Sequence, residues 1–145
     1  MLLNPIQASF NELLELLEES LDLYQDMRER LPVTSRKAQL DAMLEQRKTL
    51  HQRLQQAAVE ELDIRPRAAD QDIEGLTQLL EQFRRLWQDP EIVALDLLQD
   101  HEQELQRAFQ GLMQETDSSS LSLQLQTLLQ ELKEHLEATE VWLVH

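Results

Sequence analysis

The chain has 145 residues, no cysteine, and 28 Asp and Glu against 13 Lys and Arg, which gives a net charge of −15 at pH 7. That charge repels phosphate backbones and anionic lipid, so we expect neither nucleic acid nor membrane as a partner, and without cysteine there is no disulfide or thiolate chemistry. Hydrophobic residues make up 41% of the chain but aromatic ones only 4%, a leucine-rich composition that predicts one helical domain over residues 1–145.

The first predicted helix covers residues 5–31. Asn4 can cap it and Pro5 suits its first position, where a missing N–H is no loss. Pro32 ends it, because the residue before a proline is driven out of the α region. Its apolar face comprises Phe10, Leu13, Leu17, Ser20 or Leu21, Tyr24, Met27 and Leu31.

The second predicted helix covers residues 35–62 and follows a tight connection, with Thr34 or Ser35 as its cap. Arg47 lies on its apolar face. The other members of that face are Leu40, Met43, Leu44, Leu50, Leu54 and Ala57. Because the connection is short, we expect the first two helices to be antiparallel neighbours.

A longer stretch separates this pair from the rest of the chain. Residues 63–72, DIRPRAADQD, interrupt the periodic pattern with Pro66 and mixed charges, and are expected to form a loop. A shorter helix is predicted over residues 73–88, IEGLTQLLEQFRRLWQ, with Leu76, Leu79, Leu80, Phe83, Leu86 and Trp87 on one side.

The next predicted helix has the clearest start in the sequence and extends to about Glu115. Asp89 caps it, Pro90 takes the first position, and Glu91 meets the positive end of the helix dipole. Its apolar positions are Leu95, Leu98, Leu105, Phe109 and Leu112. Glu102 interrupts this stripe, and a carboxylate on the buried side of a helix needs an explanation.

The last predicted helix follows TDSSSL, residues 116–121, which supplies several capping side chains. Its apolar positions are Leu121, Leu125, Leu128, Leu132, Leu136 and Trp142. We find no strand candidate. The pattern predicts an all-α four-helix bundle made of two antiparallel helical hairpins, joined by a long crossover that carries the short extra helix.

This organisation resembles the ferritin-like class, and more specifically a bacterial family of ferritin-like four-helix bundles known as a domain of unknown function. The resemblance is strongest over residues 89–140, fainter over residues 10–27 and 40–57, and residues 75–88 match the crossover helix of that family. It implies a ferritin-like fold over nearly the whole chain.

Di-iron bundles draw a Glu from each of two helices and a Glu-x-x-His motif from each of the other two. Glu102 suits such a position, but its counterpart on the first helix is Leu17. The residues three before His135 and His51 are Leu132 and Lys48, so both partner carboxylates are missing. We therefore predict no di-iron centre, no cofactor and no metal ligand.

Two alternatives remain for Glu102. A single metal ion held by Glu102, His135 and either His51 or His101 is one, although we expect three of these four side chains to face solvent. The other is structural: a buried ion pair with Arg47, which we prefer, or a solvated Glu102 at the rim of the core. If the pair is buried, replacing both members by apolar residues is expected to be neutral to stabilising.

No catalytic residue is identified, so the chain is not predicted to be an enzyme. Ser118, Ser119 and Ser120 are explained as helix caps, since no His and acid are placed to activate them. Tyr24 is expected to be a core residue with its hydroxyl at the edge of the core.

Three functions remain open. The first is a non-enzymatic bundle that is structural or binds an unknown protein partner, with a homodimer possible. The second is a metal-binding ferritin-like protein with a degenerate carboxylate and histidine site, and the third is a small acidic secretion or flagellar export chaperone. The N-terminus lacks a basic signal region and no apolar run approaches the ~20 residues of a membrane span, so a cytoplasmic protein is expected.

Overall fold

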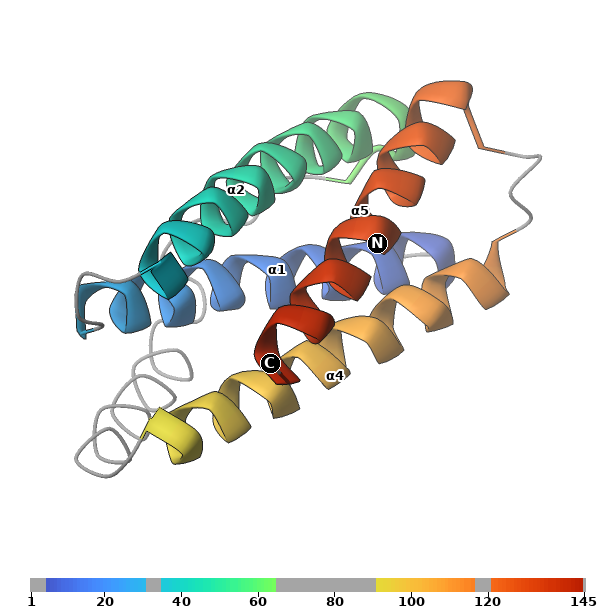
Figure 1. The fold of residues 1–145 in the computed structure, drawn as a ribbon. Coiled ribbons are helices and arrows are strands. Elements are labelled where there is room, and N and C mark those ends of the chain that lie inside the picture. Colours follow the sequence, from blue (N-terminus) through green and yellow to red (C-terminus); the bar gives the residue numbers. More distant parts are fainter. Residues whose placement is uncertain (1–4, 31–34, 65–90, 117–120, 145) are drawn as a thin grey trace.

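The computed structural model describes residues 5–30, 35–64, 91–116 and 121–144. They form four α-helices, α1 (Pro5–Arg30), α2 (Ser35–Leu62), α4 (Glu91–Glu115) and α5 (Leu123–Val144) (Figure 1). The prediction of an all-α, four-helix protein is confirmed, and the described part of the chain contains no strand. The helix predicted over residues 73–88 and the caps predicted at Ser118–Ser120 lie outside the described residues.

Each helix packs against two others. Helix α1 contacts α2 and α4, and α5 contacts the same two helices. Figure 1 shows α1 and α5 running in one direction and α2 and α4 in the other, so neighbouring helices are antiparallel. The figure also shows α4 and α5 diverging toward the end of α4 and the start of α5. None of the described helices has a segment both long and apolar enough to cross a lipid bilayer.

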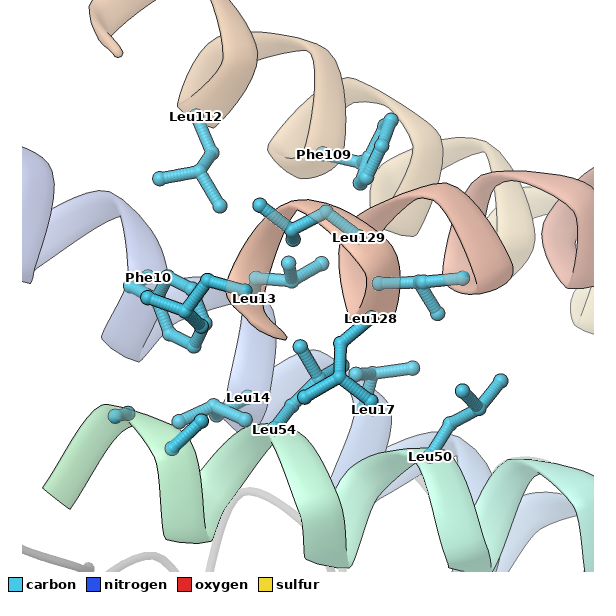
Figure 2. Packing of buried hydrophobic residues seen from close by; sticks show 14 of the residues in the cluster. Phe10, Leu13, Leu14, Leu17, Leu50, Leu54, Phe109, Leu112, Leu128 and Leu129 are labelled. Carbon is cyan, nitrogen blue, oxygen red and sulfur yellow. The ribbon is translucent and has the colours of Figure 1, made fainter. Parts of the chain in front are cut away.

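The apolar core is divided into two clusters. The large cluster joins the first half of α1, the second half of α2, the second half of α4 and the first half of α5, as antiparallel neighbours require (Figure 2). Its members are Phe10, Leu13, Leu14, Leu17, Leu50, Leu54, Ala57, Ala58, Ile64, Leu105, Phe109, Leu112, Leu125, Leu128, Leu129, Leu132 and Leu136. The small cluster lies toward the other end and comprises Leu23, Tyr24, Met27, Leu40, Leu44, Leu98 and Leu143.

Two helix ends show how the chain enters and leaves this core. Asp63 follows α2 with φ of 53°, a left-handed conformation that Asp tolerates better than most residues. It turns the chain so that the Ile64 N–H donates to the Ala58 carbonyl and the Ile64 side chain is buried. At the start of α5, the Ser122 hydroxyl accepts a hydrogen bond from the Leu125 N–H at 3.1 Å. The helix therefore begins after Ser122, and the prediction that Leu121 belongs to it is wrong.

Candidate functional site

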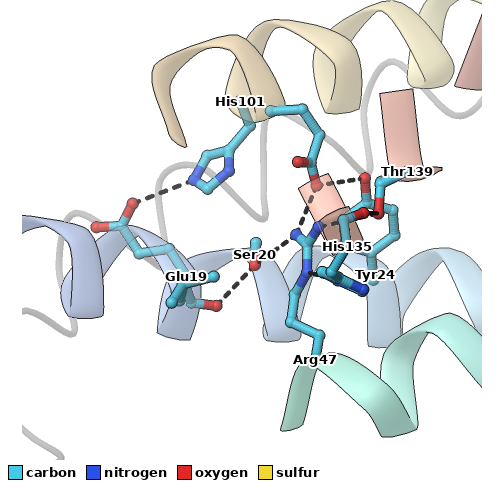
Figure 3. Close-up of polar contacts among 9 residues, drawn as sticks. Glu19, Ser20, Tyr24, Arg47, His101, His135 and Thr139 are labelled. Atoms are coloured by element: carbon cyan, nitrogen blue, oxygen red, sulfur yellow. Dashed lines mark hydrogen bonds and ion pairs between the residues drawn. The ribbon is translucent and has the colours of Figure 1, made fainter. Parts of the chain in front are cut away.

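Buried polar side chains contact one another in the interior of the bundle (Figure 3). Along the helices they lie between the members of the large cluster and those of the small cluster. They come from all four helices and are centred on Arg47, whose side chain is among the largest fully buried ones in the protein. We call this group the polar layer; its members are Ser20 and Tyr24 on α1, Arg47 on α2, Glu102 on α4, and His135 and Thr139 on α5.

The predicted ion pair between Arg47 and Glu102 is confirmed. Arg47 Nη1 lies 2.5 Å from Glu102 Oε1, and the two side chains are 1% and 3% exposed. Each of these residues interrupts the apolar face of its own helix, so packing those faces together brings the two charges to one place. Burial of either charge alone is strongly unfavourable, whereas the pair satisfies both.

The Arg47 guanidinium makes three further hydrogen bonds, so each of its three nitrogen atoms has at least one acceptor. Its Nε–H donates to His135 Nε2 at 2.9 Å, Nη1 donates to Ser20 Oγ at 3.0 Å, and Nη2 donates to Thr139 Oγ1 at 3.3 Å. Both hydroxyls donate their own hydrogen to a carbonyl in their helix, Ser20 to Leu17 and Thr139 to His135. Their lone pairs are thus left free to face the guanidinium, which suits a group that only donates.

Tyr24 completes the surroundings of the ion pair, and the expectation that its hydroxyl lies at the edge of the core is wrong. Its hydroxyl donates to Glu102 Oε1 at 2.8 Å, and its ring lies with its centroid 5.1 Å from the Arg47 guanidinium carbon, a cation–π distance. Burial, together with the neighbouring Glu102 carboxylate, raises the pKa of Tyr24 well above 10. The hydroxyl therefore stays protonated, as its role of hydrogen-bond donor requires.

His135 is neutral in this environment. Burial, and next to it the positive charge of Arg47, lowers the pKa of His135 to about 3. Because Nε2 accepts the Arg47 N–H, the ring hydrogen must be on Nδ1. For Arg47, burial acts to lower the pKa, but Glu102 and Tyr24 oppose this effect and the pKa ends above its usual value.

These states determine what the polar layer can do chemically. The Arg47 guanidinium cannot release a proton at any accessible pH. The Tyr24 proton and the His135 Nε2 lone pair are both engaged inside the layer. Glu102 Oε2 differs, since no hydrogen-bond partner for it occurs among the described residues. The polar layer thus links the four helices through side chains that bond to one another, while Glu102 Oε2 is not part of these contacts.

The structure brings only two of the four metal-ligand candidates to this layer. Glu102 and His135 both contact Arg47. His101 lies 3.4 Å from the Glu19 carboxylate, measured from Nε2 to Oε2. His51 is half-buried beside α1; burial lowers its pKa, and Glu18 partly offsets the effect. No group of three or more His, Cys, Asp or Glu able to hold a metal ion occurs in the part of the chain that the structure describes.

The expectation that three of these four side chains face solvent is wrong. His101, Glu102 and His135 are 7%, 2% and 2% exposed. The helices bury a wider arc than one apolar stripe, so residues beside the stripe are also covered. The same reason explains why sequence reasoning missed His135 and Thr139 as partners of Arg47. Ser20 was missed as well, although its place on the apolar face of α1 between Leu17 and Tyr24 was a signal for it.

Comparisons with known proteins identify no relative of this chain. No protein-family model matches it, and neither a curated protein nor a solved structure matches it significantly.

Proposed function

We propose that this chain is a non-enzymatic four-helix bundle of the ferritin-like type that acts in the cytoplasm as a structural or protein-binding component. The antiparallel packing of α1 on α2 and of α4 on α5 supports the two-hairpin arrangement in this proposal. One observation carries the functional part. The centre of the bundle, where a ferritin-like protein holds its metal, contains the guanidinium of Arg47.

A metal ion at this centre would compete with a positive charge that is already there. Binding it would require Glu102 to leave Arg47, and His135 Nε2 to give up the Arg47 N–H. Arg47, which is 1% exposed, would then carry an unpaired charge in the core. Breaking a buried pair in this way costs about 3–5 kcal/mol. The degenerate metal site is therefore disfavoured, and the protein acts through its surface.

Elemental analysis of the full-length protein, purified without chelator, tests this proposal. We expect iron, manganese and zinc each to be far below one equivalent per chain. A stoichiometric metal would overturn the proposal. Glu102→Gln would then locate the ion, with Glu45→Gln as the matched control, because Glu45 is an exposed carboxylate on α2. Loss of metal in the first variant alone would place it in the polar layer.

An export chaperone is the second candidate, because α4 and α5 leave an apolar groove open between them. The groove occupies only one part of the molecule. Most of the other stripe leucines whose side chains the structure describes are buried in the two clusters. A chaperone that holds an extended client along its length would need more of this apolar surface exposed, so we favour the structural or protein-binding role.

A further inference from the structure

An apolar groove opens between α4 and α5. It has a volume of about 890 Å³ and lies where the two helices diverge. Phe109, Met113, Leu121 and Leu129 line it, and Phe109 and Leu129 also belong to the large cluster. Leu123 stands at its edge with 78% of its surface exposed. A hollow that reaches the core thus lies beside a projecting leucine.

The charge of the groove differs from that of the chain. Its charged lining residues are Glu131 and Lys133, which balance each other, whereas the whole chain carries −15. Four of its other lining residues are glutamines: Gln110, Gln114, Gln126 and Gln130. The side chains of Gln126 and Gln130 already donate within the chain, to the Leu121 carbonyl and to Glu134. An amide such as that of Gln110 or Gln114 has both donors and acceptors, so it can pair with an identical amide, while two carboxylates facing each other repel.

We infer that this groove is the interface for a second copy of the chain, an inference that rests on the proposed protein-binding role and names the partner. In a two-fold arrangement the same patch meets itself. Leu123 of each copy would enter the hollow of the other, and Lys133 of one copy would face Glu131 of the other. A projecting side chain next to a hollow is the self-complementary shape that such an interface needs.

The balanced charge favours a second copy over a basic partner helix. A basic helix would gain most from an acidic groove, and this acidic chain has enough carboxylates to build one, yet the lining has a net charge of zero. The distant carboxylates still repel between copies, but salt screens them, with a Debye length of about 10 Å at 0.1 M and about 3 Å at 1 M. Self-association should therefore strengthen as NaCl is raised.

Sedimentation equilibrium of the full-length protein over a range of concentrations tests the inference. We expect a monomer–dimer equilibrium that Leu123→Glu weakens at least about tenfold, because it places two carboxylates in the interface. Val141→Glu is the matched control, since Val141 is also an exposed apolar residue on α5, at 57%, and does not line the groove. Circular dichroism should show both variants folded, because both side chains are exposed.

A second pair of variants tests the charge argument. Lys133→Glu and Lys48→Glu change the net charge equally, but only Lys133 lines the groove. We expect Lys133→Glu to weaken the dimer several-fold more than Lys48→Glu.

A wild-type protein that stays monomeric at all concentrations and salt levels would overturn the inference. Equal effects within either pair, or a dimer that weakens as NaCl is raised, would overturn it as well. The inference and the proposed function fail on different measurements. A monomeric protein would contradict the dimer, whereas only a stoichiometric metal would contradict the proposed function.

Discussion

Around Leu13 and Leu132 the four helices meet through aliphatic side chains, whereas around Arg47 the same four helices meet through hydrogen bonds and an ion pair. In the large cluster no contact depends on a particular orientation, because dispersion and burial are non-directional. In the polar layer each donor of Arg47 needs a specific acceptor on another helix. The first region supplies stability, and we propose that the second selects one alignment of the helices.

A wrong register of the helices would cost free energy at the polar layer. Sliding α2 by one turn would move the buried Arg47 charge away from Glu102 and into contact with leucines of either cluster. A misplaced leucine in the same slide would still meet apolar neighbours. The polar layer therefore penalises wrong registers more than it stabilises the right one, a role that buried polar groups have in some bundles.

Breaking the ion pair should have the largest effect. Glu102→Leu leaves the charge of Arg47 buried, and we expect it to lower the free energy of unfolding by about 3–5 kcal/mol. Adding Arg47→Leu should recover part of this loss. We expect the recovery to be incomplete, because Tyr24 and His135 also lose their partners. This revises the expectation from the sequence that the double replacement is neutral to stabilising. Urea unfolding of the two single variants and the double variant measures the coupling. A double variant whose loss equals the sum of the two single losses would contradict this coupling.

Substitutions in the two apolar clusters should lower the free energy of unfolding additively, in contrast to the coupled losses expected for the ion pair. Leu17→Ala in the large cluster and Leu40→Ala in the small cluster should each cost about 3 kcal/mol, since both side chains are fully buried. Because the two residues belong to separate clusters, their effects should add to within about 0.5 kcal/mol. Urea unfolding of the double variant is the check. Strong coupling would mean that the polar layer does not separate the two clusters.

This contrast also explains how far the sequence could predict the structure. Helix bounds depend on local signals such as Pro5, Pro32 and the apolar period, and these are readable in one chain. The Arg47–Glu102 pair was predictable too, because each charge interrupts an apolar stripe and neither is tolerated alone. These features need no knowledge of how the helices are rotated.

The other members of the polar layer depend on that rotation. His135 and Thr139 lie four residues apart on α5 and reach Arg47 only because α5 turns that side toward α2. A leucine stripe leaves the rotation uncertain by a fraction of a turn, and this is enough to move a neighbouring histidine between solvent and core. A Ser or Thr in a helix does not by itself predict a contact with another helix, since these residues commonly hydrogen-bond to their own backbone.

The pH dependence of stability offers the finest test of the contrast, since the polar layer contributes to it through His135 whereas the large cluster has no titratable member. Unfolded His135 binds a proton below its ordinary pKa near 6.5, whereas in the folded protein its pKa is about 3. Between these values the unfolded state holds more protons, so the free energy of unfolding falls as pH falls, by up to about 1.4 kcal/mol per pH unit.

His135→Gln keeps an acceptor for Arg47 but does not titrate, while other groups such as His51 titrate as before. The stability of the wild type minus that of this variant should therefore decrease from pH 6 to pH 4 in urea unfolding. Parallel curves for the two proteins would mean that His135 is not held neutral by burial and Arg47.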